Sequence, residues 1–363
     1  MSRLEHVRAH AYTRSLFPAT SLRGAIDTMG FVQADPIRSP ARAQDLILRH
    51  RVHEYRAGDL DRAYGTLDLE EDVLYAYGFM PHQVWRLLHP RRAMILPSLE
   101  REVMMMVRSL GPLHPRELEK HFGRERVVNT WGGYSKATKC ALEHLHYVGL
   151  VRVAGRENGI RIYEVAPDFG EPAPLAERLT KLILVVANLL APVPERSLQE
   201  ALAPLRRAML GAGNTRYAVE EMVGAGLLCR EVIEGMPYLW PVEAEPVGET
   251  GRWEAPDDVR LLAPFDPLVW DRRRFEHIWG WQYRFEAYTP VARRVRGYYA
   301  MPMLWRDVVI GWGNVNVVDR RMSVELGFVG KRPRERAFEQ ALEAEIERMN
   351  RFLNLADAAP SPQ

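Results

Sequence analysis

The feature of this 363-residue chain that most restricts its fold is a repeated pattern in which a helix ends at glycine and leads into a β-hairpin. In the clearest copy, residues 99–165, an apolar-periodic helix stops at Gly111 and a short helix opens at Pro115. A third helix is expected from an N-cap at Ser135 to Gly149. Two strands are expected next, at Leu150–Val153 and Ile160–Val165. Three helices and then a hairpin are the element order of a winged helix-turn-helix.

The same pattern occurs twice more. Residues 141–150 align with residues 218–227, and a hairpin with its turn at Glu234 and Gly235 follows the second of these segments. An earlier copy, residues 25–31, runs into a strand at Val32–Asp35. We therefore expect three tandem winged-helix units, in residues 1–97, 98–168 and 169–241. A helix that ends in glycine before a strand is common, and this alternative weighs most against the earliest copy.

The remaining sequence, from residue 242 on, differs in composition and in the elements that it predicts. Residues 242–256 form a polar linker rich in proline and glycine. Residues 257–332 predict a small β-rich, barrel-like domain, and residues 333–363 predict a C-terminal amphipathic helix with a tail. The expected strands are Val259–Leu262, Ala287–Thr289, Arg296–Ala300, Val308–Gly311 and Ser323–Phe328. The fold class is therefore α+β.

Cysteine usage and hydropathy exclude several protein classes. Cys140 and Cys229 lie far apart with no Cys-x-x-Cys pair, which argues against structural zinc, iron–sulfur clusters and a disulfide framework. The most apolar run, Leu182–Ala191, is too short to span a bilayer. The first residues carry charges where a signal peptide needs an apolar run. We expect a cytoplasmic protein.

The charge of the chain is balanced overall but unevenly distributed. The formal net charge is only +2, which excludes a simple polybasic coat for nucleic acid. Residues 1–58 nevertheless hold nine arginines against five carboxylates, and residues 259–300 hold eight against four. Residues 59–72 supply much of the compensating acid, with six carboxylates against one arginine. This local imbalance favours a polyanionic partner such as DNA.

Basic residues within these regions are candidates for contacts to DNA. Some are interleaved with aromatic residues, a pattern that suits a backbone groove with stacking groups, although most of these aromatics are equally expected in a core. Lysines one turn apart on the third helix of the second unit are candidates too, with ordinary solvated lysines as an equal alternative. The candidates are Arg38, Arg42, Lys136, Lys139, Arg272, Arg273, Arg274, Arg293, Arg294 and Arg296.

The short strand around Gln33 and Asp35 carries the candidate chemistry. Side chains alternate along a strand, so Gln33 and Asp35 are expected on the same face. A neighbouring amide and carboxylate can position a water, accept its proton, or stabilise a cationic sugar transition state. Taken alone the pair is a weak signal, and an ordinary polar strand edge that ends at Pro36 is the simpler interpretation.

Four segments carry a family resemblance: Phe31–Ile37, Leu262–Arg274, Tyr283–Pro290 and Gly297–Pro302. With the winged-helix repeats, they resemble the bacterial YcaQ/AlkX-type DNA glycosylases, relatives of the AlkZ glycosylases, over essentially the whole chain. The family's Gln-x-Asp catalytic motif falls on Gln33 and Asp35. The run Leu74–Met80 lacks a histidine that the family often has, and Asn314–Asn316 replaces an Asp-Pro-Lys-like run.

The resemblance implies a DNA repair enzyme. Its substrate would be double-stranded DNA that carries N7- or N3-alkylated purines or interstrand crosslinks, and it would hydrolyse the N-glycosidic bond. Asp35 would act as general base or stabilise the oxocarbenium-like sugar, and Gln33 would orient the water. No cofactor or metal is implied. A tandem array within one chain has little need of a dimer, so we expect a monomer located in the cytoplasm at the nucleoid.

Lysine usage bears on the reaction type. Lyase chemistry needs an amine that forms a Schiff base, and no lysine occurs before Lys120 or next to Gln33 and Asp35. We therefore expect a monofunctional glycosylase. The main alternative is a non-catalytic winged-helix regulator. A metal-dependent nuclease would want a lysine or histidine among the acids of residues 59–72, and a helix-hairpin-helix glycosylase would want a suitable catalytic lysine.

Overall fold

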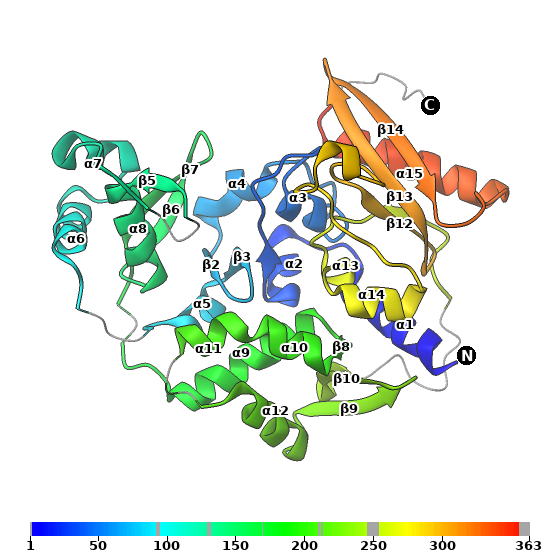
Figure 1. Ribbon diagram of the computed structural model, residues 1–363, viewed down its shortest axis with the longest axis horizontal. Coiled ribbons are helices and arrows are strands. Elements are labelled where there is room, and N and C mark those ends of the chain that lie inside the picture. Colours follow the sequence, from blue (N-terminus) through cyan, green and yellow to red (C-terminus); the bar gives the residue numbers. More distant parts are fainter. Residues whose placement is uncertain are drawn as a thin grey trace.

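The computed structural model describes residues 2–91, 95–128, 132–168, 170–209, 211, 213–244 and 254–355. The chain forms an α+β structure whose N-terminal elements lie at the centre (Figure 1). The segments 98–165, 175–241 and 259–352 surround this centre on three sides. The predicted fold class, α+β, is confirmed at this level. Most of the predicted linker, residues 245–253, and the tail, residues 356–363, lie outside the described residues.

The central part contains a small antiparallel sheet with strand order β1-β3-β2. Ser21 accepts the Gly24 N–H at the start of α2, and Gly30, at φ +69°, ends this helix. Phe31 and Val32 follow and are completely buried, which seats β1 in the core. The elements are α1 (Arg3–Ser15), α2 (Leu22–Met29), β1 (Val32–Gln33), α3 (Ala43–Leu48), α4 (Asp59–Ala63), β2 (Leu69–Val73), β3 (Tyr77–Pro81) and α5 (His82–Leu88).

The next part follows the expected order of three helices and a hairpin. As predicted, its first helix ends before Gly111 and its second opens at Pro115. The prediction that Ser135 caps the third helix is wrong, because Ser135 pairs with Val127 in a two-stranded sheet and the helix begins at Ala137. The elements are α6 (Ser98–Leu110), α7 (Pro115–Phe122), β4 (Arg126–Val128), β5 (Tyr134–Lys136), α8 (Ala137–Tyr147), β6 (Val151–Glu157) and β7 (Ile160–Val165).

The third part ends in the hairpin expected from the repeat. β9 and β10 pair antiparallel across Glu234 and Gly235, and β8 completes a sheet with order β8-β10-β9. The helix of the earliest copy differs from those of the other two copies, because α2 runs into a strand that pairs with the distant β3. The elements are α9 (Leu175–Leu189), β8 (Val193–Pro194), α10 (Glu195–Ala201), α11 (Ala203–Ala208), α12 (Thr215–Gly224), β9 (Leu228–Ile233) and β10 (Met236–Pro241).

The C-terminal part is an antiparallel sheet with strand order β11-β12-β13-β14. The expected strands at Ala287–Thr289 and Arg296–Ala300 are wrong, because both segments belong to a loop. Two helices that were not expected precede this loop, the second capped by Asp271, which accepts N–H groups from Arg273 and Arg274. The elements are β11 (Val259–Leu261), α13 (Pro267–Trp270), α14 (Arg272–Trp279), β12 (Met301–Trp305), β13 (Val308–Val318), β14 (Arg321–Phe328) and α15 (Arg336–Phe352).

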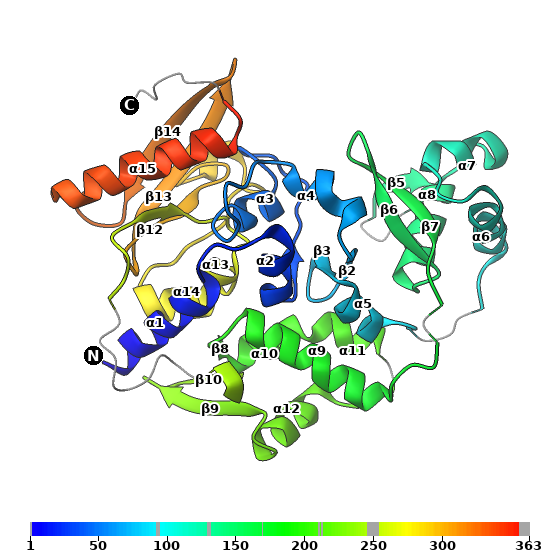
Figure 2. The ribbon, with the colours of Figure 1, turned by 180° about the vertical axis from the view of Figure 1, so that it is seen from behind.

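The final helix, α15, packs on the C-terminal sheet (Figure 2). Phe338 contacts both Trp305 and Phe328, with ring centroids 5.3 and 6.2 Å apart. A completely buried ion pair links this region to the central part: Arg51 donates to Asp266 at 2.8 and 3.0 Å. The residues that follow α3 and the segment Leu262–Arg274 are therefore held side by side.

Candidate functional site

The backbone around Gln33 is fixed by strand pairing. Gln33 lies opposite Gly78 of β3, and the Ala34 N–H donates to the Tyr77 carbonyl at 2.9 Å. Pairing therefore continues one residue beyond β1. The Oε1 atom of Gln33 is buried and has no hydrogen-bond partner among the described residues. A buried acceptor of this kind needs a donor, and a bound water or substrate would supply one.

Asp35 is half-buried where the chain leaves β1. Its Oδ1 atom accepts the Ile37 N–H at 2.9 Å, and the carboxylate forms no ion pair with any described residue. Burial raises the pKa of Asp35, and the hydrogen bond from Ile37 opposes this shift. An unpaired carboxylate in a partly dry setting interacts strongly with a positive charge that develops nearby.

Asp35 opens onto a cavity of about 730 Å³ between the central part and the second part of the chain. Arg38 and Arg42 line it together with the turn of the β6–β7 hairpin. The turn comes close: a Cβ on Gly159, at φ +80°, would lie 3.2 Å from the Arg42 guanidinium. The second part of the chain thus completes the cavity at which Asp35 lies.

The hairpin is held in place by the acidic strand β2. Glu70 pairs with Arg152 at 3.0 Å, and Glu71 pairs with Arg156 and Arg161. Glu70, Glu71 and the following Asp72 are all buried. Glu70 and Glu71 therefore form the ion pairs that join two parts of the chain.

Asp72 lines the same cavity as Asp35 but has strong partners. Burial disfavours its charge, yet Arg91 at 2.9 Å and the hydrogen bond from His89 at 2.7 Å outweigh burial and hold its pKa far below the usual value. Trp85 also donates to it, at 3.1 Å. Asp72 is thus a structural carboxylate.

Residues of α8 and β3 complete the cavity. His146 is buried with its Nε2 atom 2.8 Å from the Glu71 carbonyl, and burial lowers its pKa. Tyr77 and Tyr147 each have one ring face covered by a guanidinium, from Arg161 and Arg91. His146 thus brings an imidazole from the second part of the chain to the cavity. No local sequence signal pointed to it.

The predicted basic residues of the first and second parts lie around connected cavities. Arg38 is exposed, and Arg42 pairs with Asp61 at 2.5 Å. Lys136 and Lys139 line a neighbouring cavity of about 660 Å³, and Arg156 borders both cavities. Each lysine also has a carboxylate partner, Glu119 for Lys136 and Glu143 for Lys139. A basic path therefore leads from Asp35 past the hairpin to α8.

The prediction that Arg272–Arg274 bind DNA is wrong for Arg274, which is completely buried and donates to backbone carbonyls, including that of Pro192 at 3.2 Å. Its neighbours are also engaged inside the protein. Arg272 donates to the Pro264 carbonyl at 2.9 Å and lies over the Tyr283 ring, while Arg273 pairs with Glu200 of α10 at 2.7 Å. These arginines join α14 to its surroundings.

The other C-terminal candidates lie in the loop that precedes β12. Arg293 is exposed. Arg294 lies over the Tyr298 ring at 5.0 Å, and Arg296 lies over Trp281 at 5.1 Å. Arg293 has no ion-pair partner within the described ranges, which leaves its charge available to a phosphate.

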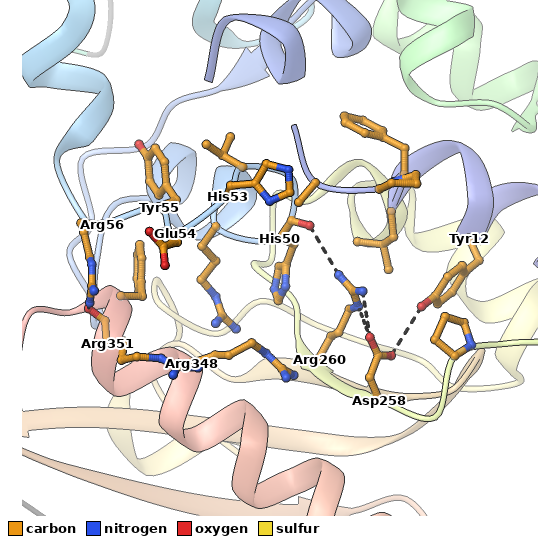
Figure 3. Close-up of a pocket in the computed structure, with 18 residues that line it drawn as sticks. Tyr12, His50, His53, Glu54, Tyr55, Arg56, Asp258, Arg260, Arg348 and Arg351 are labelled. Carbon is orange, nitrogen blue, oxygen red and sulfur yellow. Dashed lines mark hydrogen bonds and ion pairs between the residues drawn. The ribbon is translucent and has the colours of Figure 1, made fainter. Parts of the chain in front are cut away.

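A third cavity, of about 570 Å³, is lined by arginines but differs from the cavity at Asp35 (Figure 3). Arg260 pairs with Asp258 at 2.8 Å, and Arg348 pairs with Glu345 at 3.0 Å while donating to the Val259 carbonyl at 2.8 Å. These contacts attach α15 to β11. Neither Gln33 nor Asp35 lines this cavity. The candidate site is therefore the cavity at Asp35.

The comparisons with known proteins bear on the whole chain. The family model described as DNA glycosylase AlkZ-like matches residues 26–352. The structure is similar to that of the Streptomyces sahachiroi DNA glycosylase AlkZ, with a TM-score of 0.65 and 17% sequence identity over 100% of both chains. In the described part of the chain, no helix is long and apolar enough to cross a membrane. No group of three or more His, Cys, Asp or Glu residues among the described residues is placed to hold a metal ion.

Proposed function

The chain belongs to the AlkZ-like DNA glycosylase family, and we propose that it removes N7- and N3-alkylated purines and unhooks interstrand crosslinks. Family membership makes it a DNA repair enzyme that hydrolyses N-glycosyl bonds and acts on DNA. It also decides against a non-catalytic regulator. The choice of substrate rests on the chemistry of the Asp35 site.

The observation that carries the proposal is the half-buried Asp35 carboxylate without an ion-pair partner among the described residues. An N7- or N3-alkylated purine is already cationic and leaves readily, so the enzyme needs little general-acid power. What it needs is negative charge at the sugar as C1′ becomes oxocarbenium-like. Asp35 supplies that charge and accepts a proton from the attacking water. Gln33 is not among the residues that line the Asp35 cavity, so its role of orienting this water requires its buried Oε1 to turn toward Asp35 when DNA binds.

The cavity favours hydrolysis without strand cleavage. A lyase step requires an amine that attacks C1′ to form a Schiff base. Among the described residues that line the Asp35 cavity there is no lysine, and Lys136 and Lys139 face the neighbouring cavity. The product is therefore a free base and an intact abasic strand.

The walls of the cavity support an open mode of lesion recognition. Tyr77 and Tyr147 line the cavity, and each has one ring face covered by an arginine, which reduces the aromatic surface available to clamp a flipped base. A crosslinked purine cannot be extruded freely because it is tied to the opposite strand. A site that accepts the lesion without a tight base pocket fits such a substrate.

The topology supports three winged-helix units. β1-β3-β2 and β8-β10-β9 share one strand order, and a bridge between Leu113 and Tyr163 of β7 gives the second part a comparable pairing. In each part, helices separate the first strand from the hairpin. We assign the units to residues 1–97, 98–168 and 169–241.

We also infer that the protein is a monomer located in the cytoplasm at the nucleoid. Light scattering on the purified chain tests the oligomeric state.

The test uses a duplex with one N7-methylguanine and a duplex with one nitrogen-mustard crosslink. We expect release of free base from the first and unhooking of the second, with strands that break only after alkaline treatment. Asp35→Asn should lose turnover but bind the duplex nearly as well as the wild type. Asp68→Asn is the matched control, because Asp68 is an exposed carboxylate in the same part of the chain. Full activity in Asp35→Asn would refute the assignment.

A further inference from the structure

The loop between α14 and β12 is built as a rigid platform. We call residues 287–298 the Tyr288 loop. Glu286 is buried, and its Oε2 atom accepts the N–H groups of Val295, Arg296 and Gly297 at 2.9, 2.8 and 3.3 Å. Asn314 of β13 donates to the Arg296 carbonyl at 2.6 Å. Three backbone donors gathered on one buried carboxylate fix the shape of the loop from within.

The outer side of the Tyr288 loop exposes large apolar groups. Tyr288 is 79% exposed, Val291 76% and Val295 78%, and Tyr298 is also exposed. Folding alone gives no reason to hold four such side chains in water on a fixed loop. A cluster of this kind marks a surface that contacts another molecule. The exposed Arg293 lies among these side chains, which favours a polyanionic partner over a protein.

The Tyr288 loop lies next to the candidate catalytic carboxylate. The ring of Phe285 contacts Tyr288 and Tyr299, with centroids 6.1 and 5.3 Å apart. Phe285 also contacts Phe265, with centroids 5.1 Å apart. Nearby, Trp270 of α13 contacts Tyr75, and Tyr75 contacts Phe31 directly before β1, with centroids 5.0 Å apart in both pairs. The charge of Asp35 adds to burial in raising the pKa of Tyr288 and Tyr299, which agrees with this arrangement. Tyr288 is not part of the cavity wall. A duplex that presents a sugar to Asp35 would therefore meet the exposed side of the Tyr288 loop at the same time.

We propose that the Tyr288 loop is a wedge that enters the base stack of the duplex beside the alkylated nucleotide, with Tyr288 stacked on the neighbouring base. Aromatic and aliphatic side chains that insert between base steps unstack and kink DNA, and a rigid loop can impose this distortion. Opening the stack beside the lesion would bring C1′ to Asp35 without extruding the base. This inference rests on the proposed function, because it takes the Asp35 site as the place where the lesion binds.

The experiment places 2-aminopurine next to a single N7-methylguanine in a duplex and measures both its fluorescence and base release. The variants are Tyr288→Ala, Tyr288→Phe, which keeps the ring, and Tyr217→Ala. Tyr217 is a 65% exposed tyrosine on α12, far from the C-terminal sheet (Figure 1). Asp35→Asn is included because it should bind and distort the duplex without excising the base.

We expect the wild type, Tyr288→Phe, Tyr217→Ala and Asp35→Asn to raise the fluorescence, and Tyr288→Ala to leave it near the value of free duplex. Base release by Tyr288→Ala should fall about tenfold or more, the loss typical of removing one stacked base. If Tyr288→Ala matches the wild type in both measurements, the wedge is refuted while the proposed function stands. If the wild type distorts the duplex but releases no base, the proposed function fails and the wedge remains.

Discussion

Asp35 and Asp72 line one cavity, yet their surroundings act on their charges in opposite directions. Burial raises the pKa of Asp35, which has no cation to compensate it, whereas Arg91 and His89 hold the pKa of Asp72 low. Asp35, whose charge burial disfavours and no cation supports, is therefore the candidate for function, whereas Asp72 is held by partners within the fold.

This contrast predicts opposite effects on stability. Asp35→Asn removes a disfavoured charge, so its Tm should equal or exceed that of the wild type while turnover falls by about a hundredfold or more. Asp72→Asn leaves Arg91 without its buried partner, and breaking such a pair costs about 3–5 kcal/mol. Thermal unfolding of both variants at neutral pH checks this. A lower Tm for Asp35→Asn than for Asp72→Asn would contradict the two roles.

The raised pKa of Asp35 also predicts the pH dependence of catalysis. Asp35 acts in its charged form, so kcat/KM should fall as the pH falls through its pKa, which lies above the ordinary value of 3.8. Because protonation of Asp35 favours the folded state, this group causes no unfolding over the same interval. Asp72 has a lowered pKa, so its contribution to stability persists to lower pH. A pH–rate profile measured together with circular dichroism separates the loss of catalysis from unfolding. A rate that rises toward acid pH would show that Asp35 acts as a protonated group.

At the scale of elements, the position of Gln33 depends on a close approach between two strands. Gly78 of β3 lies opposite Gln33, and a Cβ at Gly78 would come within 2.3 Å of the Val32 carbonyl oxygen and 2.4 Å of the Phe31 ring. Only glycine allows β3 to approach β1 this closely. The catalytic strand is thus set by the absence of a side chain on its neighbour.

Gly78→Ala should therefore displace β1 and impair both stability and catalysis. Overpacking of this kind typically costs about 1–3 kcal/mol, and base release should fall with it because Gln33 and Asp35 follow the strand. Gly65→Ala is the matched control, since a Cβ there meets no atom within 4 Å. Chemical denaturation and single-turnover base release measure the two effects. Wild-type behaviour of Gly78→Ala would show that the strands tolerate separation.

Local patterns in the sequence predicted the elements whose signals are local. The end of α6 at Gly111, the start of α7 at Pro115 and the β9–β10 hairpin all follow from caps and turn residues. The segments 287–289 and 296–300 look β-rich because they hold aromatics, but they form a loop built on Glu286, in which Tyr288 and Tyr298 are exposed and Tyr299 is buried. The helix α14 was missed although Asp271 is an ordinary cap, because Arg272–Arg274 were interpreted as contacts to DNA and not as the start of a helix.

The site was predictable only in part. Gln33 and Asp35 lie in one short segment and were identified through a family resemblance. Most of the other residues that line the cavity with Asp35 come from distant segments. The contribution of His146 and the β6–β7 hairpin depends on buried pairs between β2 and the second part of the chain, such as Glu71 with Arg156. The local sequence around β2 does not indicate that its carboxylates pair with arginines of the β6–β7 hairpin.

At the scale of the whole molecule, the arginines divide into two groups. One group, which includes Arg51 and Arg274, is buried and joins parts of the chain through contacts to carboxylates and backbone carbonyls. Arg38 and Arg293 are exposed, and neither has an ion-pair partner among the described residues. The near-neutral net charge hides this division, because many arginines already have acidic partners within the fold.

The exposed group predicts the salt dependence of DNA binding. If Arg38 and Arg293 each contact a phosphate, then Arg38→Ala and Arg293→Ala should each lower the slope of log K against log salt by about one, for any duplex sequence. Lys331→Ala is the control, because Lys331 is exposed beyond β14 and lies outside the proposed path. Fluorescence anisotropy at several salt concentrations measures the slopes. Unchanged slopes in both variants would remove these residues from the DNA-binding surface.

The most direct test of the central role of Asp35 is a paired measurement of binding and single-turnover base release on a duplex with one N7-methylguanine. With enzyme in saturating excess, the wild type should release the base and leave an intact abasic strand. Asp35→Asn should bind with nearly the same Kd but release the base at least about a hundredfold more slowly. Base release by Asp35→Asn at the wild-type rate, with equal occupancy of the DNA, would contradict the role assigned to this carboxylate.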